Sequence, residues 1–480
     1  MGIEISGIGL VTAQGCSADI LNKSPISAPK PLFWDSKPWI TCHVCFPAQG
    51  IDPMLRGSKR WQALAKVALN DCINIQSMKP GVPLIIASCN GGIHSFNTKN
   101  WQNAFNSEYL LEDTPYKSQH LPVVSASCVS GLHALYLATK LLKAGEKEII
   151  VLAVDILSPA NHDNYEALRI LDGNPNLPWQ TNNLGFIPGE AAVALLLTHS
   201  NPQSRNPQLS EPILTQDLNT TNGLNYALAA LAPLKPDIIF GQGTGPNETD
   251  EIELKALQLN IDMKIPLTTT LVNFGHTNGA TGLLSVALAA LAWRFSSFIP
   301  TLNMRAKFAA DGRPLGKDVT VTNCAAIICR ALGGACAAVS LTRENQPCTS
   351  MNSYWQRPDN VGPLIHPLLR KIAAQAMEMR PKRPPEMLIV RLETPLVPLP
   401  KSRIGERLLP SSILEITPGF FPRLISRCWG FAGAAICLVG DSNTNTAIKQ
   451  LIQTLQDSGQ TIYYVDVQGK GEERYVKWAA

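Results

Sequence analysis

Apolar residues recur along the chain with two spacings, and the two spacings alternate. Short, almost continuous apolar runs at 83–89, 148–155 and 191–197 predict buried strands. Between these runs, apolar residues stand three and four positions apart at 60–74 and 131–145, which predicts amphipathic helices. Strands that alternate with helices favour parallel sheets covered by helices.

Residues 213–343 repeat this pattern. Their expected elements are helices through 225–234, from Glu251 and up to Phe295, a strand at 237–243, an apolar stretch at 265–275, and closing strands at 320–328 and 335–341. A polar, Pro-rich stretch at 201–212 is typical of a linker or surface loop. We therefore expect two halves, 1–200 and 201–343, that together form a duplicated α/β/α/β/α sandwich.

Residues 344–480 form a further α/β region. A polar linker is expected at 344–360, followed by a helix at 367–379 and strands at 386–393 and 461–468. The region resembles the first half in outline, since LPVVSASCVSG and FPRLISRCWGF both place Pro six residues before Cys, at Cys128 and Cys428. A degenerate copy of the N-terminal half and a chance similarity both fit this pattern.

Composition narrows the class of protein. The 480 residues are 45% apolar and only 16% charged, enough for a large core, which excludes global disorder. No apolar run is long enough to predict a membrane span, and the N-terminus lacks the basic start of a signal peptide, so a cytoplasmic location is expected. A net charge of +4 gives no reason to expect a nucleic-acid partner. The twelve scattered cysteines fit reduced thiols, and no metal site is expected.

The sharpest candidate for chemistry is Cys128. It follows small residues at an expected strand-to-helix turn, where the helix N-terminus favours the thiolate and a backbone N–H can receive an oxyanion. A buried structural cysteine is the alternative.

Two other loops carry polar candidates. Gln242 stands in the Gly-rich segment GQGTG after an expected strand, and His276 lies between Gly275 and Asn278 just before a long helix. Strand ends are where open α/β sheets bind ligands. The ordinary alternative for the Gln242 segment is a loop before a helix with acidic residues at its N-terminus. The ordinary alternative for His276 is a histidine buried in the core.

Together these segments resemble the β-ketoacyl synthases of the thiolase-like superfamily across roughly residues 1–343. Ser125–Gly131 is similar to their nucleophile motif and places Cys128 on the acyl-accepting cysteine. Four further segments, 184–197, 241–253, 273–282 and 330–341, are similar to the family's later motifs. On this resemblance the catalytic residues are Cys128, His276 and Gln242, and the residues of the substrate and oxyanion loops and their support are Glu190, Thr244, Asn273, Leu332, Gly333 and Gly334.

The sequence departs from the family at three positions. The family's first histidine falls on Gln242, a lysine falls on Leu271, and the phenylalanine before the closing glycines falls on Leu332. A rival alignment takes 430–433 as the closing loop. Glutamine offers an amide donor but cannot become cationic, so acid–base steps would fall to His276.

The resemblance implies an enzyme that takes an acyl group from a carrier thioester onto Cys128 and condenses it with a malonyl unit, in fatty acid or polyketide biosynthesis. A non-condensing partner subunit similar to chain length factors, and an acyltransferase or thioester hydrolase, are the alternatives. The implied partners are an acyl carrier protein and a second subunit, either an identical copy or a related ketosynthase. No cofactor is implied beyond the carrier's phosphopantetheine arm.

Overall fold

The computed structural model describes residues 2–21, 27–34, 40–72, 81–94, 103–173, 178–181, 183–201, 203–217, 222–295, 306–316, 321, 323–343, 367–394, 417–468 and 475–479. Most strands belong to one large mixed sheet. They are β1 (Ile3–Thr12), β2 (Gly15–Cys16), β5 (Leu84–Ala87), β6 (Val123–Val124), β7 (Glu148–Asp155), β8 (Ala191–His199), β9 (Gln208–Leu209), β10 (Ile213–Gln216), β11 (Ile238–Phe240), β12 (Leu267–Thr268), β13 (Cys324–Arg330), β14 (Ala335–Thr342), β15 (Met387–Glu393), β16 (Ala434–Gly440), β17 (Ile462–Gln468) and β18 (Tyr475–Ala479). Their order is β12-β11-β13-β14-β9-β1-β8-β7-β5-β6-β16-β15-β17-β18, with β10 beside β14 and β2 beside β1. A separate hairpin pairs β3 (Lys30–Pro31) with β4 (Val44–Cys45).

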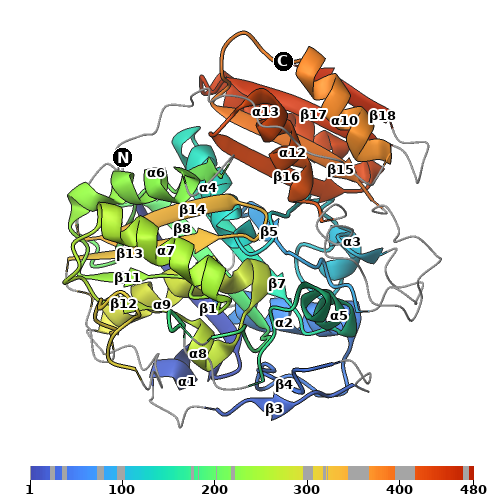
Figure 1. Cartoon of the computed structure of the whole chain (residues 1–480). Helices are drawn as coiled ribbons and strands as arrows, with labels where there is room; N and C mark the ends of the chain where they lie inside the picture. Colours follow the sequence, from blue (N-terminus) through green and yellow to red (C-terminus); the bar gives the residue numbers. More distant parts are fainter. Residues whose placement is uncertain are drawn as a thin grey trace.

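Two helices lie between two layers of this sheet. They are α4 (Ser130–Lys143) and α9 (Thr281–Phe295), and their side chains share one core with β1, β7 and β8 on one side and β11, β13 and β14 on the other. Both helices are apolar on nearly every face because both sides are covered. The outer face of the first layer carries α2 (Gly57–Cys72), and that of the second carries α6 (Asn222–Leu231) and α7 (Asn247–Asn260). The expected α/β/α/β/α sandwich is therefore confirmed (Figure 1).

Shorter helices complete the described chain. They are α1 (Ser17–Leu21), α3 (Ser107–Leu110), α5 (Pro159–Leu168), α8 (Leu271–Phe274) and the 3-10 turns η3 (Ala232–Leu234), η4 (Asn278–Ala280) and η6 (Ser442–Thr444). None of the helices within the described ranges has the length and apolar character that crossing a bilayer requires.

The structure corrects one local prediction and assigns one stretch that the sequence left without an element. The stretch at 201–212 contains β9, whose buried Gln208 and Leu209 pair with both β1 and β14 and so join the two sheet layers. The apolar stretch at 265–275 is a two-residue strand, β12, followed by α8. In both cases a long-range strand pairing or a tight turn decided the structure, and neither leaves a periodic pattern in the sequence.

The C-terminal region extends the sheet instead of forming a separate layer. Its helices are α10 (Pro367–Glu378), α12 (Phe420–Trp429) and α13 (Asn445–Asp457). Strand β16 pairs antiparallel with β6, with Leu438 opposite Val124 and Val439 opposite Val123. Figure 1 shows this orange and red segment beside α4 and β5. The expected polar linker at 344–360 lies outside the described residues.

The first half and the C-terminal region share a Pro-to-Cys spacing, but the two cysteines do not occupy equivalent positions in the structure. Cys128 follows β6, whereas Cys428 lies inside α12 and precedes β16. The two cysteines therefore occupy different places in the element order.

Candidate active site

The turn that carries Cys128 is tightly built. Strand β6 ends at Val124 and α4 begins at Ser130, so five residues reverse the chain between them. Ser127 adopts φ 53, in the left-handed region that a side chain rarely occupies. The Ser130 hydroxyl holds this conformation, since it accepts from the Ala126 N–H at 2.8 Å and donates to the Ser127 carbonyl at 2.6 Å.

His276 faces the sulfur of Cys128. The distance between Cys128 Sγ and His276 Nε2 is 3.2 Å. The imidazole stacks on Phe186, with ring centroids 4.3 Å apart and planes inclined by 21°. Its backbone is fixed to the strand-like segment before β8, because the His276 N–H donates to the Ile187 carbonyl and the Gly189 N–H donates to the His276 carbonyl.

Glycine allows the two loops to meet. A Cβ on Gly131, in the first turn of α4, would stand 2.9 Å from the Gly279 carbonyl oxygen of the histidine loop. Close packing of the two loops is therefore the reason for glycine at position 131. A larger residue there would separate Cys128 from His276.

Burial controls the protonation of this pair. It raises the pKa of Cys128 to about 12, and the negative charge of Asp155 adds to the rise. It lowers the pKa of His276 to about 4. Loss of hydration therefore opposes the thiolate that the helix N-terminus favours.

Gln242 presents its amide nitrogen to the same place. Its backbone N–H donates to Glu253 at 2.7 Å, and its Oε1 accepts from the Arg330 N–H at 2.6 Å. Nε2 is buried and has no hydrogen-bond partner among the described residues, although the side chain lies near enough to Cys128 to oppose slightly the rise in the thiol pKa. An unpaired buried donor is costly, which marks Nε2 as a group that awaits an acceptor.

A cavity of about 30 Å³ brings the three residues together. Its lining is Cys128, Tyr165, Ile170, Phe186, Gln242, Thr244, Pro246, Thr249, Glu253, His276, Arg330 and Leu332. Of the loop residues expected from the sequence, Thr244 and Leu332 reach the cavity. Asn273, Gly333 and Gly334 are not among its lining residues.

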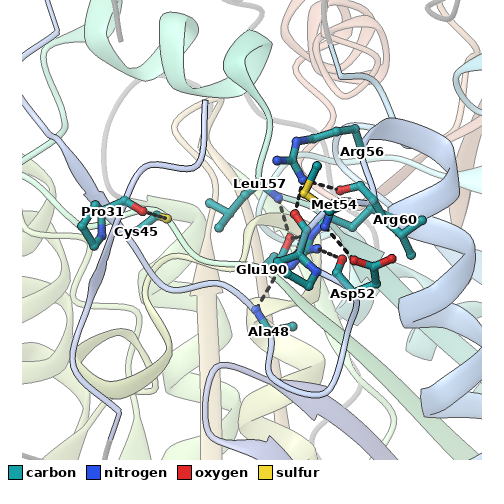
Figure 2. A network of polar contacts seen from close by, with 11 residues as sticks. Pro31, Cys45, Ala48, Asp52, Met54, Arg56, Arg60, Leu157 and Glu190 are labelled. Atoms are coloured by element: carbon teal, nitrogen blue, oxygen red, sulfur yellow. Dashed lines mark hydrogen bonds and ion pairs between the residues drawn. The ribbon is translucent and has the colours of Figure 1, made fainter. Parts of the chain in front are cut away.

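Glu190 supports the loops from a distance. It is fully buried and forms an ion pair with Arg60 of α2, whose Nε donates to Glu190 Oε2 at 2.8 Å. The Ala48 and Leu157 N–H groups also donate to its carboxylate (Figure 2). Glu190 does not line the cavity, so the structure leaves it the supporting role and not a substrate contact.

Asp155 is a site-supporting residue that sequence reasoning missed. At the end of β7 it accepts from Ser88 Oγ at 2.7 Å and from the N–H groups of Cys89, Asn90 and Gly279 at 2.7 to 2.9 Å. It thereby ties the histidine loop to the loop after β5, and burial raises its pKa to about 6. The available signal was a carboxylate that ends an otherwise apolar strand.

Leu271 is buried where the resemblance expects a lysine. It packs with Ile170, Leu171 and Phe186 in a small core beside the cavity. The described residues contain no group of three or more His, Cys, Asp or Glu side chains that could hold a metal ion.

Comparison with known proteins agrees with this geometry. Residues 122–202 match the β-ketoacyl synthase N-terminal domain and residues 222–305 match the β-ketoacyl synthase C-terminal domain. The chain is 24% identical over 215 residues to the tetracenomycin polyketide synthase ketoacyl synthase alpha subunit of Streptomyces glaucescens, covering 38% of this chain and 49% of that protein. It is 26% identical over 209 residues to the putative polyketide β-ketoacyl synthase 1 of Streptomyces virginiae, covering 38% of this chain and 50% of that protein. The match spans half or less of the length of these curated relatives.

Solved structures share the fold. The ishigamide ketosynthase/chain length factor superposes with a TM-score of 0.61 at 16% identity, over 71% of this chain and 98% of that one. The PfaC ketosynthase–chain length factor superposes with a TM-score of 0.69 at 13% identity, over 97% of this chain and 74% of that one. The two matched β-ketoacyl synthase domains follow each other in order and contain Cys128, Gln242 and His276, and the fold is similar to that of these ketosynthases.

Proposed function

We propose that the chain is a β-ketoacyl synthase-like transferase that takes an acyl group from a carrier thioester onto Cys128 and condenses it with a malonyl unit. The 3.2 Å approach of Cys128 Sγ to His276 Nε2, beside the unpaired amide of Gln242, carries this proposal. A sulfur nucleophile next to an imidazole and an amide donor supplies what acyl transfer needs.

In the first half-reaction, Cys128 Sγ attacks the thioester carbonyl carbon on the phosphopantetheine arm of an acyl carrier protein. A carbon–sulfur bond forms at Cys128 and the bond to the carrier sulfur breaks. The thiol proton ends on the departing carrier sulfur, and His276 Nε2, 3.2 Å from Sγ, relays it in the tautomer that leaves Nε2 without a proton. Because burial raises the pKa of the thiol, proton loss is expected to accompany the attack.

In the second half-reaction, the malonyl unit loses CO₂ and the electron pair of the broken bond forms an enolate. The enolate carbon attacks the acyl carbonyl carbon, the bond between that carbon and Cys128 Sγ breaks, and the released thiolate takes up a proton from water. The Gln242 amide is placed to hydrogen-bond the enolate oxygen, and His276 supplies a second contact when Nε2 carries a proton. Proton exchange falls to His276, since glutamine cannot take part in it.

A non-condensing partner subunit, similar to a chain length factor, is the second candidate. The buried apolar Leu271 and the small size of the cavity, about 30 Å³, favour it. An acyltransferase or hydrolase would use the same groups without decarboxylation. A second subunit, either an identical copy or a related ketosynthase, stays a prediction, as do a cytoplasmic location and a fatty acid or polyketide pathway.

The test is the intact mass of the protein after exposure to acyl and malonyl carrier thioesters, with Cys128→Ala in parallel. An acyl adduct that requires Cys128 and turns over with loss of CO₂ supports the synthase. An adduct that only hydrolyses supports the transferase or hydrolase. No adduct on a folded protein would contradict the proposal and favour the partner subunit.

A further inference from the structure

The strands of the C-terminal region are arranged like four strands of the first half, but they follow one another across the sheet in the opposite order. The order β8-β7-β5-β6 is followed directly by β16-β15-β17-β18. In each set, the central strand (β5 or β15) is parallel to both neighbours, and the last strand (β8 or β18) is antiparallel. The two sets meet at the antiparallel pair β6–β16.

The helices repeat the same scheme. Along the chain, α2, β5, α3, β6, α4, β7 and β8 correspond in order to α10, β15, α12, β16, α13, β17 and β18, while α5, between β7 and β8, has no counterpart among the described residues. The apolar faces of α2 and α10 cover one side of the sheet in one core, and α4 and α13 cover the other side in a second core. An antiparallel pair with equivalent helices on equivalent sides is the arrangement of a two-fold axis through β6 and β16.

The repeated unit lacks the nucleophile. The counterpart of the turn that holds Cys128 is Asp441–Thr444, between β16 and α13. There the Asp441 carboxylate accepts from the N–H groups of Asn443 and Thr444 and closes the turn. The described part of the C-terminal region therefore holds no second copy of the Cys128 turn.

The C-terminal region instead contacts the nucleophile turn directly. The Ser125 N–H donates to the Cys437 carbonyl of β16 at 3.1 Å. A Cβ on Gly419, just before α12, would lie 3.0 Å from Ala126 Cα and 3.4 Å from the Ser127 nitrogen. A Cβ on Gly334 would lie 3.5 Å from Arg423 Nε, so α12 also reaches the closing glycine loop.

We propose that the described part of residues 367–479 takes the place of a partner subunit: a chemically silent internal copy that occupies the β6 edge and positions the Cys128 turn through Gly419. The fold likeness to PfaC ketosynthase–chain length factor agrees, since it covers 97% of this chain while the likeness to the ishigamide protein covers 71%. The unit that holds the site is then one chain, in place of the dimer expected from the sequence. This inference does not depend on the condensing activity.

The first test is the mass of the full chain in solution by light scattering. A single 52.0 kDa species is expected, because β6 is already paired within the chain. A stable dimer would contradict the proposal that the C-terminal region replaces a partner subunit.

The second test is the rate at which iodoacetamide alkylates Cys128 in Gly419→Val, a reaction that needs no acyl carrier. Branched carbons at 419 would push against Ala126 and Ser127 backbone atoms, and a change of about tenfold or more is expected. Gly173→Val is the matched control, since a Cβ there meets nothing closer than 3.9 Å.

Val467→Ala in β17 is a second control, which distinguishes a change in the position of the Cys128 turn from a general loss of stability. It opens the core of the same C-terminal region two strands away from β16. It should lower the melting temperature and leave the alkylation rate near that of the unmodified chain. Equal effects of Gly419→Val and Val467→Ala on that rate, or no effect of Gly419→Val, would overturn the positioning role.

Discussion

At the scale of single residues, the side chains that take part in the reaction were easier to predict than the side chains that hold them in place. Cys128, Gln242 and His276 stand in short segments rich in Gly, Ser or Thr, and such segments leave room for a substrate. Asp155 was missed and Glu190 was expected nearer the reaction, because a supporting carboxylate is defined by the distant N–H groups that it binds. Those partners come together only in the folded chain.

The raised pKa of Cys128 gives the first prediction. Between pH 7 and pH 10, its alkylation rate should rise about tenfold per pH unit without a plateau, because only the thiolate reacts and the pKa lies near 12. Mass spectrometry of the Cys128 peptide after timed iodoacetamide treatment measures this rate. A plateau at neutral pH would instead indicate a thiolate–imidazolium pair.

Gln242 gives the second prediction. Gln242→Leu removes the amide that faces the cavity, and malonyl decarboxylation should fall about 10²- to 10³-fold, the usual effect of losing one oxyanion donor. Gln242→His should raise the rate by supplying a ring donor. Release of CO₂ from malonyl carrier thioester is the measurement.

Gln453→Leu serves as the matched control for Gln242→Leu, since Gln453 is exposed on α13. An unchanged rate in Gln242→Leu, with folding verified by circular dichroism, would remove Gln242 from the site.

At the scale of elements, the long helices and the buried strands followed from periodicity. Expected helices at 60–74 and 131–145 are α2 and α4, because their apolar stripes must be covered. Strand β9 and helix α8 did not follow, since two-residue pairings and four-residue turns are set by neighbours far away in sequence.

The ion pair between α2 and the start of β8 gives a prediction at this scale. Arg60→Met leaves the Glu190 carboxylate buried without its cation and should lower the free energy of unfolding by about 3–5 kcal/mol. Urea denaturation measures the loss.

Lys59→Met on the same helix is the matched control, because Lys59 pairs with Glu112 on the solvent side. It should change stability little. If the Arg60 and Lys59 variants were equally stable, the Glu190 network would not hold the first layer together.

At the scale of the whole molecule, the sandwich was predictable and the role of the last third was not. The matched cysteines at 128 and 428 suggested a repeat with the wrong register, because the sequence similarity joined a turn after β6 to a helix before β16. The repeat of seven elements about the β6–β16 pair is visible only in the strand order.

The pairing of β16 with β6 within one polypeptide also affects assembly in the cell. Two separate subunits exchange partners and come apart on dilution, whereas a covalently joined segment stays at a local concentration of about millimolar whatever the amount of protein. Specific activity should therefore be independent of protein concentration, and no balanced expression of a second gene product is needed to complete this edge of the sheet.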